Sequence, residues 1–216
     1  MHISTLARAG VFCLLLSACS SYLTTAENIS NTKQSYTKVL VIGRSKDNTA
    51  RVKFENSVVE QLQESGIGAV SSYSMAGTKN ITEEYTEAQI AQFKKKLISD
   101  GVDGAIVTNL INTEQYTDVI PGNSSAAYIP RRVGRFGRYY TYYPVTYWEP
   151  DQLTSGTKYI FESSFYRLAD APGDNIQWIG RFELKYPFSI RKTAENYAKE
   201  LVKALLKNVL LPTIKT

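Results

Sequence analysis

The sequence is nearly without histidine and cysteine, and this shortage limits the chemistry that is open to it. Its 216 residues include one histidine, His2, and two cysteines, Cys13 and Cys19. All three lie close to the N-terminus, so that no imidazole and no thiol follows residue 19. Without them the rest of the chain cannot form Ser-His-Asp or Cys-His catalytic sets, or zinc sites built from those ligands. Disulfide bridges within that part are excluded for the same reason.

Long hydrophobic runs are absent as well. The most apolar segment, residues 11–16, is far shorter than the roughly 20 residues that a helix needs to cross a bilayer. It follows a weakly basic stretch that contains His2 and Arg8, and small residues come after it. A basic start, a short apolar run and small residues before a cut are the parts of a secretory signal peptide. We therefore predict that residues 1–18 are removed, and that Cys13 leaves with them.

The end of the apolar run reads Leu16-Ser17-Ala18-Cys19. This run resembles the bacterial lipobox, in which the cysteine thiol is lipidated and its freed amine is then acylated. The resemblance implies lipidation at Cys19. Since Ser20 stands where an aspartate would retain the protein, it also implies an outer-membrane location facing the periplasm. Each buried methylene contributes about 0.8 kcal/mol, so two or three acyl chains hold a protein to a membrane essentially permanently. The alternative is an ordinary secretory signal with a chance cysteine.

Charge of either sign is moderate and only slightly unbalanced. The chain has 25 basic and 20 acidic residues, which gives a net charge of +5. Removal of residues 1–18 takes away Arg8 and no acidic residue, and leaves a net charge of +4. An excess of this size fits an anionic lipid or glycan surface as a neighbour. It is too diffuse to indicate nucleic acid, and we predict no nucleic-acid partner.

Residues 38–111 alternate between strand and helix patterns. The predicted elements are a strand over 38–43, a helix over 47–65, a strand over 69–73, a helix over 86–100 and a strand over 105–108. The second helix begins at a capping-box pair, Thr86 and Gln89, and Ile90, Phe93 and Leu97 line its apolar face. A β-α-β-α-β order predicts crossover connections and a largely parallel start to the sheet.

The last part of the chain has the pattern of an antiparallel hairpin followed by a long helix. Apolar residues from Ile176 to Leu184 alternate with polar ones, which predicts a half-buried strand paired with residues 157–168. The helix begins near Ser189 and ends before Pro212. Its predicted buried stripe consists of Ala194, Tyr197, Ala198, Leu201, Leu205 and Val209. The fold class is therefore α/β: a two-layer or three-layer mixed sheet, β-α-β-α-β, then a β-hairpin and a C-terminal helix.

Two segments fall outside these elements. Residues 19–37 are rich in Ser, Thr, Asn and Gln, and we interpret them as a lipidated flexible tether. The single α/β domain then covers residues 38–212. It contains an insertion rich in Tyr, Arg and Gly at residues 121–156, with no acidic residue between Asp118 and Glu149. Loops of this length are uncommon in compact domains and often carry function.

Other motifs that carry chemistry give weak signals. The sequence has no G-x-S-x-G elbow, phosphate-binding loop or EF-hand pattern, and we predict no cofactor and no metal. Residues 43–46 follow a strand, where a phosphate could bind at the start of the next helix, but a single glycine gives no phosphate cradle and a strand-to-helix turn is the favoured interpretation. Glu83, Glu84 and Glu87 fit the start of a helix, where acidic side chains offset the helix dipole. A glycosidase that uses two carboxylates remains an alternative.

The insertion is the candidate binding surface. Its arginines and aromatic residues provide large rigid area and hydrogen bonds, which enrich both residue types in interface hot spots. The candidate contact residues are Arg131, Arg132, Arg135, Arg138, Tyr140, Tyr143 and Trp148. Two other interpretations compete: a loop or hairpin that packs on the sheet, and a hairpin inserted in a membrane. Membrane insertion needs one apolar face, whereas the aromatics around residues 138–147 fall on both faces.

Several stretches of the chain resemble known proteins in their pattern. These are residues 38–42, the helix ending at Gly66, residues 103–107, the Gly/Tyr-rich insertion, and residues 159–163 with 177–180. They resemble an uncharacterised family of bacterial outer-membrane lipoproteins. The order of elements is similar to the periplasmic domain of the curli-secretion lipoprotein CsgG and the N-terminal domain of TolB. The resemblance implies a small α/β domain that binds proteins or self-associates, and it carries no catalytic motif.

Together these features predict a lipoprotein that acts as a binding or assembly module in the cell envelope and is not an enzyme. Its expected partners are the membrane, through lipid on Cys19, and an envelope protein, a second copy of the chain, or an anionic lipid or glycan surface. The alternatives are a carboxylate-dependent envelope hydrolase acting on a glycan, and an oligomeric component associated with secretion.

Overall fold

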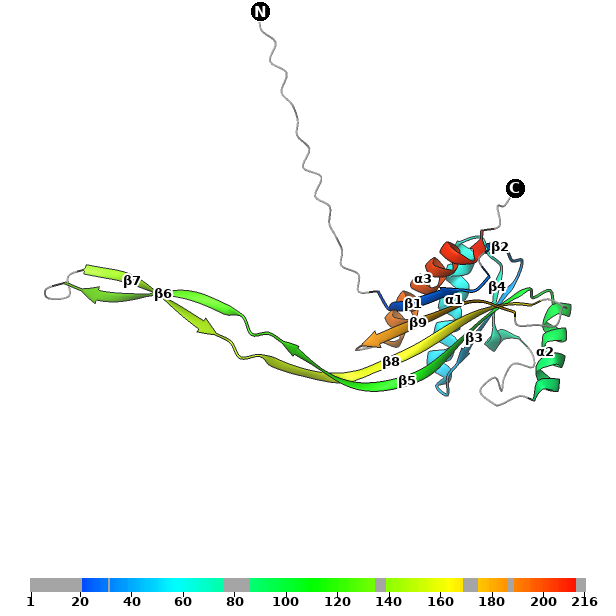
Figure 1. Cartoon of the computed structure of the whole chain (residues 1–216), viewed down its shortest axis with the longest axis horizontal. Helices are drawn as coiled ribbons and strands as arrows, with labels where there is room; N and C mark the ends of the chain where they lie inside the picture. Colours follow the sequence, from blue (N-terminus) through cyan, green and yellow to red (C-terminus); the bar gives the residue numbers. More distant parts are fainter. Residues whose placement is uncertain are drawn as a thin grey trace, which may run out of the picture.

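The computed structural model describes residues 21–30, 32–75, 86–134, 139–168, 175–185 and 189–212. A body of helices and strands carries a long two-stranded extension that leaves one end of its sheet (Figure 1). The strands are β1 (Leu23–Asn28), β2 (Gln34–Ser35), β3 (Val39–Arg44), β4 (Ala69–Ser71), β5 (Gly104–Ile120), β6 (Ser124–Val133), β7 (Tyr139–Trp148), β8 (Gln152–Arg167), β9 (Ile176–Lys185) and β10 (Leu210–Leu211). The helices are α1 (Asn48–Glu64), α2 (Glu87–Ser99) and α3 (Ile190–Asn208), with a 3-10 turn, η1 (Ser72–Ser74).

The body is built on a six-stranded sheet with the order β1-β9-β8-β5-β3-β4. Strand β3 pairs in parallel with both β4 and β5. The pairs β5–β8, β8–β9 and β1–β9 are antiparallel. The parallel pairs come from the first half of the chain, where helices supply the crossover connections that parallel strands require. The predicted mixed α/β fold, with its parallel start, antiparallel hairpin and C-terminal helix, is confirmed.

The helices begin where the sequence predicts. The Asp47 carboxylate accepts hydrogen bonds from two backbone N–H groups in the first turn of α1, at 2.8 and 3.1 Å. Thr86 and Gln89 form the reciprocal capping box at the start of α2. These side chains satisfy N–H groups that a first turn leaves without helical partners. In the described part of the chain, no helix has both the length and the hydropathy that crossing a bilayer takes.

Strand β3 lies between two apolar clusters on opposite faces of the sheet. Val39 and Val41 belong to the larger cluster, which includes residues of α1 and α3. Leu40 and Ile42 belong to the smaller cluster, together with Leu97 of α2. Alternate residues of a strand point to opposite faces, so this strand is buried on both sides. That is why its sequence is an unbroken apolar run.

Helices α3 and α2 differ in how well their packing agrees with the prediction from sequence. Every residue of the predicted stripe of α3 is buried, and the stripe packs against Trp178 and Phe182 of β9. In α2, Leu97 is buried, but Ile90 is 54% exposed, which contradicts its predicted place on the buried face. The last turn of α2 supplies its buried contact with the sheet, since Leu97 is its only buried residue. The apolar spacing therefore overstated how much of this helix is covered.

The predicted tether at residues 19–37 is wrong for the part that the structure describes. Residues 23–28 form β1, which pairs with β9 at one edge of the sheet. The Glu200 carboxylate of α3 accepts hydrogen bonds from the backbone N–H groups of Tyr22 and Leu23 at 2.7 and 3.0 Å. Most side chains of β1 are exposed, so backbone pairing rather than apolar burial holds this strand. Cys19 and the predicted signal at residues 1–18 lie outside the described residues.

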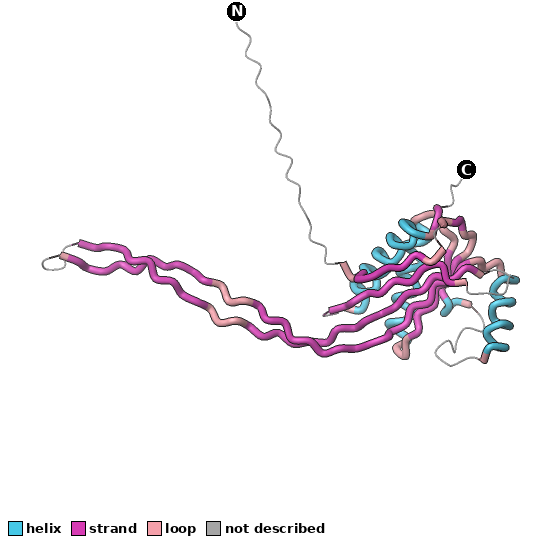
Figure 2. Tube along the Cα trace, viewed as in Figure 1, coloured by secondary structure: helices cyan, strands magenta, loops and turns pink. Residues whose placement is uncertain are grey.

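The predicted insertion is a regular ribbon instead of a loop. Beyond the sheet, β5 and β8 continue as a pair from Gln115↔Thr157 to Ile120↔Gln152, and β6 and β7 prolong it. Figure 2 shows the ribbon running far from the body. We call residues 115–157 the arm and the remaining described residues the body. At about 3.3 Å per residue, the strand path from Gln115 to Val133 is about 60 Å long.

Candidate functional site

The arm begins at a polar root where β9 ends. Lys158 of β8 lies 2.7 Å from Glu114 of β5 and 3.6 Å from Glu183 of β9. Its hydrogen bond with Glu114 raises the pKa of Lys158. Lys185, the last residue of β9, lies 3.7 Å from Asp118 on the arm. Opposite charges on neighbouring strands stabilise their pairing, so these contacts hold the arm in line with the sheet.

A glycine joint separates the inner and outer halves of the arm. The Gly122 N–H donates a hydrogen bond to the Asp151 carboxylate at 2.8 Å, and the Glu149 N–H donates one to the Asn123 carbonyl at 3.0 Å. A Cβ added to Gly122 would lie 1.7 Å from the backbone oxygen of Glu149. Only glycine permits the two strands to approach so closely. At this point the ribbon passes from the β5–β8 pair to the β6–β7 pair.

Aromatic side chains lie on both faces of the outer half of the arm. Paired residues of an antiparallel ladder share a face, and successive residues alternate between faces. One face carries Tyr128, Tyr140, Tyr142 and Trp148, and the other carries Tyr143 and Tyr147. Their exposed fractions run from 48% for Tyr143 to 77% for Trp148. Among the described side chains of β6 and β7 none is buried, so this ribbon is an aromatic surface without a core.

Two of the predicted contact residues meet across the ribbon. The Arg132 Nε–H donates a hydrogen bond to the Tyr140 hydroxyl at 2.7 Å. The Arg132 guanidinium also lies 5.3 Å from the centre of that ring, within range of a cation–π contact. Both residues are exposed. An arginine held against a tyrosine in this way presents its remaining N–H donors to solvent, where a carboxylate, phosphate or sugar hydroxyl can reach them.

The other predicted contact residues are spread out. Arg131 and Tyr143 project from the face opposite Tyr140, and Trp148 follows Tyr140 by eight residues, about 26 Å along the strand. The predicted residues therefore mark an extended surface with two faces and not one pocket. Arg135 and Arg138 lie outside the described residues.

Both long edges of the arm are open. Within the described residues, the outer parts of β5 and β8 pair only with each other, and so do β6 and β7. An unpaired edge presents a row of backbone N–H and C=O groups that can pair with another strand. A single two-stranded ribbon is marginally stable in water at best. The arm thus has the geometry of a segment that is completed by contact with something else.

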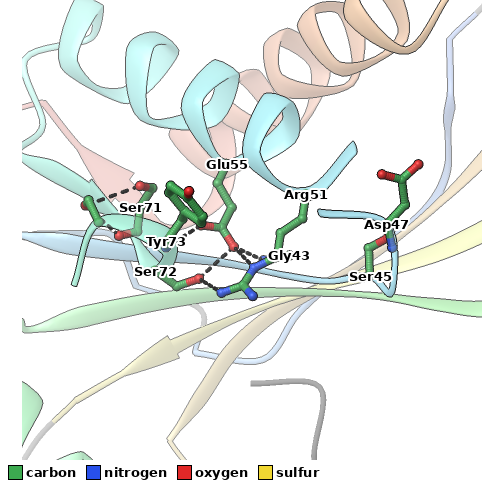
Figure 3. Close-up of polar contacts among 9 residues, drawn as sticks. Gly43, Ser45, Asp47, Arg51, Glu55, Ser71, Ser72 and Tyr73 are labelled. Carbon is green, nitrogen blue, oxygen red and sulfur yellow. Dashed lines mark hydrogen bonds and ion pairs between the residues drawn. The ribbon is translucent and has the colours of Figure 1, made fainter. Parts of the chain in front are cut away.

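The body contains a buried ionic cluster that sequence reasoning missed (Figure 3). Arg51 Nε donates to the Glu55 carboxylate at 3.0 Å and its Nη2 donates to the Ser72 hydroxyl at 2.9 Å. Glu55 also accepts from Ser72 Oγ at 2.6 Å and from the N–H groups of Gly43 and Tyr73 at 3.0 and 2.9 Å. Glu55 and Ser72 are fully buried and Arg51 is 4% exposed. The cluster ties α1 to the end of β3 and to η1.

A signal for this cluster was present in the sequence. Arg51 and Glu55 are four residues apart and continue the spacing of Val58 and Leu62, which are buried on the same helix. Charged residues on an apolar stripe are rarely buried unless they are paired, so the spacing indicates a buried pair. Every donor described for the Glu55 carboxylate belongs to the body itself. We therefore assign the cluster a structural role.

A cavity of about 340 Å³ opens beside the root of the arm, between the N-terminal halves of α1 and α3. Phe54, Phe161 and Leu184 contribute to its lining. Deeper in, the hydroxyls of Thr108 and Ser163 lie 2.6 Å apart, and the Tyr197 hydroxyl lies 3.0 Å from Ser163. Burial raises the pKa of Tyr197, although these hydrogen bonds oppose the shift.

This cavity offers little to a reaction that needs two carboxylates. Among the described residues that line it, Asp47 is the one carboxylate, and it caps α1. Glu87 lies in the first turn of α2, as an acid that offsets the helix dipole does, while Glu83 and Glu84 are outside the described residues. Gly43 and Arg44 are the last residues of β3, and Ser45 and Lys46 lead from that strand toward α1. Across the described part of the chain, no group of three or more His, Cys, Asp or Glu side chains lies close enough together to hold a metal ion.

Comparisons with known proteins give structural likenesses alone. No family model matches the chain, and no curated protein matches it. Two crystal structures of the PelC dodecamer from Paraburkholderia phytofirmans are similar, one of a point variant with 8% identity and a second with 9% identity. Both matches have a TM-score of 0.43 and cover 84% of this chain. The match to the point variant covers 98% of the PelC chain, and the second match covers 96%.

A third solved structure, a PDZ domain protein from Parabacteroides distasonis, has 12% identity and a TM-score of 0.32. The match covers 86% of this chain and 34% of that one. At scores this low, none of these likenesses assigns a family, a partner or an activity to the chain.

Proposed function

We propose that this chain is a lipid-anchored protein of the cell envelope that works by binding and assembly, without catalysis, and that the arm is its contact element. One observation carries the proposal. The arm is an ordered ribbon with aromatic side chains on both faces and unpaired backbone along both edges, and it projects from a body with its own closed core. Surfaces of this kind are found where proteins meet partners.

The energetics of the arm support a partner. A two-stranded ribbon without a core gains little from burial, while ordering each residue costs about 1–2 kcal/mol of backbone entropy. Covering aromatic side chains such as Tyr142 and Trp148 would remove large apolar areas from water, which is the main favourable term in association. The ordered arm is therefore explained best as one half of an interface.

The chemistry of the arm narrows the partner to three kinds. Open strand edges suit a second copy of the chain or an envelope protein that adds a strand. The exposed rings stack on sugars, and Arg131 and Arg132 bind carboxylate or phosphate. Since each arm has two open edges, copies can pair side by side in series, which favours self-association and the alternative of an oligomeric component associated with secretion.

The contact role is tested by removing the aromatic surface. Tyr142→Ser/Trp148→Ser changes one face of the arm, and Tyr73→Ser, an exposed tyrosine of the body, serves as the matched control. Envelopes are crosslinked in whole cells, and the purified chain is sized by light scattering. We expect the arm variant to lose its crosslinked partners or its oligomers while the control keeps them. Identical partners and sizes for all three proteins would remove the arm from consideration.

The anchor is a separate part of the proposal. It rests on Leu16-Ser17-Ala18-Cys19 and on the outer-membrane sorting that Ser20 implies. Cells that express Cys19→Ala are fractionated and compared with wild type. We expect the variant to leave the membrane fraction and its intact mass to lack lipid. A variant that stays in the membrane fraction without lipid contradicts the anchor but leaves the arm untouched.

We also propose that the body is arranged in three layers and belongs among outer-membrane lipoproteins whose soluble domain resembles that of CsgG and TolB. Support for the layers comes from the two apolar clusters, one shared by the sheet with α1 and α3 and the other with α2. Proteolysis of the native chain should then release the arm before it cuts either helical layer, because both layers bury apolar side chains and the arm does not.

A further inference from the structure

One face of α3 carries lysines that form no ion pair with an acidic residue in the described part of the chain. Lys192, Lys199, Lys203 and Lys207 are separated by seven, four and four residues, so that they share one face of the helix at 3.6 residues per turn. All four are exposed, on the side opposite the buried stripe of α3. We call these four residues the lysine stripe.

The acidic residues of α3 are engaged elsewhere. Glu195 lies 2.9 Å from Arg191 in an ion pair of its own. Glu200 accepts hydrogen bonds from the backbone N–H groups of Tyr22 and Leu23 and from the Ser21 hydroxyl at 2.9 Å. Since α3 contains no other acidic residue, its outer face is a row of cationic heads.

The same helix holds the start of the described chain. Through Glu200, α3 fixes residues 21–23 beside the lysine stripe. Cys19 is two residues before Ser21, and successive Cα atoms are 3.8 Å apart, so the two Cα atoms are separated by about 8 Å at most. A lipid on Cys19 would hold this part of α3 within about one Debye length of the headgroups, where opposite charges are only partly screened.

We infer that the lysine stripe is a membrane-docking surface that binds the anionic phospholipid headgroups of the bilayer in which the anchor sits. The inference rests on the proposed lipidation of Cys19 for its orientation. Two observations support it. Cys19 is only two residues before Ser21, which donates a hydrogen bond to Glu200 of α3, and the stripe carries a positive charge that no described ion pair offsets. The acyl chains would supply the attachment, and the stripe, attracted to anionic headgroups, would fix the body flat against the bilayer. The arm leaves one end of the sheet and runs far beyond α3 (Figure 1).

The test uses the full mature chain with Cys19→Ser, so that no lipid contributes. Its binding to vesicles of phosphatidylcholine, with and without phosphatidylglycerol, is measured by flotation at low and physiological salt. The stripe variant is Lys192→Gln/Lys199→Gln/Lys203→Gln/Lys207→Gln. The matched control is Lys53→Gln/Lys94→Gln/Lys95→Gln/Lys96→Gln, which removes the same charge from α1 and α2.

We expect wild type to prefer the phosphatidylglycerol vesicles, and the stripe variant to lose about a hundredfold in affinity for them, with a weaker dependence on salt. The control should stay within about twofold of wild type. Equal losses in both variants, or no preference of wild type for the anionic vesicles, would overturn the inference. Circular dichroism of both variants verifies that the substitutions leave the body folded.

Failure of the anchor and failure of the stripe are distinguishable. The vesicle experiment contains no lipidated protein, so it answers for the stripe alone, whereas fractionation of Cys19→Ala cells answers for the anchor alone. In lipidated wild type on intact membranes, we expect Lys199 and Lys203 of α3 to react more slowly with a water-soluble amine reagent than Lys94 and Lys95 of α2. If wild-type Lys199 and Lys203 already react as fast as Lys94 and Lys95, α3 does not face the bilayer and the inference is wrong.

Discussion

Body and arm use the same residue types in opposite ways. In the body, Trp178 and Tyr197 are at most 3% exposed and pack in the core between β9 and α3. In the arm, Trp148 and Tyr142 are 77% and 64% exposed. Aromatic composition alone therefore does not tell a core from a contact surface. What separates the two is whether the sheet that carries the residues has a third strand and a helix to cover it.

This difference separates stability from binding. Burial of apolar side chains is the dominant favourable term in folding, and nearly all of it lies in the body. The arm adds backbone pairing and surface contacts with little burial. We therefore expect substitutions in the body to change the free energy of unfolding, and substitutions in the arm to change association.

Loss of the buried carboxylate should destabilise the body most. Glu55→Ala removes the carboxylate that the buried Arg51 guanidinium contacts and takes the same acceptor from the N–H groups of Gly43 and Tyr73. Removing one partner of a buried ion pair costs about 3–5 kcal/mol. Urea unfolding followed by tryptophan fluorescence measures the change.

The double variant Arg51→Met/Glu55→Leu is the informative control for the same site. Replacing both charges with apolar groups of similar volume is often neutral in other proteins, so it should be less harmful than Glu55→Ala alone. Equal damage from the single and the double variant would mean that the hydrogen bonds to backbone, and not the unpaired charge, dominate the cost.

Crowding Trp178 should have the next largest effect. A Cβ on Gly180 would lie 2.1 Å from Cη2 of the Trp178 ring, which is fully buried. Gly180→Ala therefore forces the ring or the strand to move, and overpacking of this kind costs about 1–3 kcal/mol. Thermal unfolding gives the measurement, with Gly101→Ala as a control at which nothing lies within 4 Å of the added Cβ. That control reports the strain of a positive φ without crowding. A stability unchanged by Gly180→Ala would contradict the packing described for β9.

Most helices and strands of the body could be predicted from the sequence because the local sequence signals agree with the packing. The capping box at Thr86 and the apolar stripe of α3 each predicted an element that the structure contains. Exceptions occur where a strand or helix is only partly covered. β1 escaped notice because an edge strand with exposed side chains needs no apolar pattern. Ile90 fits the apolar spacing of α2, but it is exposed while Leu97 on the same face is buried.

The arm was predictable in composition but not in form. Its residues were identified as the candidate surface from their Tyr and Arg content, and their exposure agrees with that choice. Their organisation as a ribbon depends on the register between the strands, which places Arg132 opposite Tyr140. A sequence pattern specifies register when one face of the strands is apolar and buried, and the strands of the arm have no such face. The cluster of Arg51 and Glu55 was missed because burial of a charge is decided by partners distant in sequence, here Ser72.

A smaller and opposite effect is expected at Tyr36. This ring is 3% exposed and stacks edge-on against Phe165, yet its hydroxyl is buried with no hydrogen-bond partner among the described residues. An unsatisfied buried polar group costs about 1–3 kcal/mol, so Tyr36→Phe should leave stability unchanged or raise it by about 1 kcal/mol at neutral pH. A loss greater than that of an exposed control, Tyr73→Phe, would show that the hydroxyl is solvated or bonded after all.

The pH dependence of the same variant gives a second measurement. Burial is the main cause that raises the pKa of Tyr36 to about 12, from 10.0 in the unfolded chain. A raised pKa means that the unfolded state releases its proton first, so this contribution to stability is full below pH 10 and is lost as the pH rises to about 12. Tyr36→Phe should lose less stability than wild type over that window. Parallel decline of the two proteins would assign the alkaline loss to other groups.

The smallest effect on unfolding belongs to the arm, and it is the most telling. Tyr142→Ser/Trp148→Ser removes two large exposed rings from β7, and we expect the free energy of unfolding of the body to change by less than about 0.5 kcal/mol, as for other surface substitutions. The unfolding midpoint of the monomer, measured under conditions that dissociate any assembly, is the relevant quantity. If the rings packed on the body in solution, the loss would approach the cost of a core aromatic, about 3–5 kcal/mol, and the division into a closed body and an open arm would fail. A change near zero, combined with loss of partners in the envelope, requires that the residues of the arm are ordered for contact and not for folding.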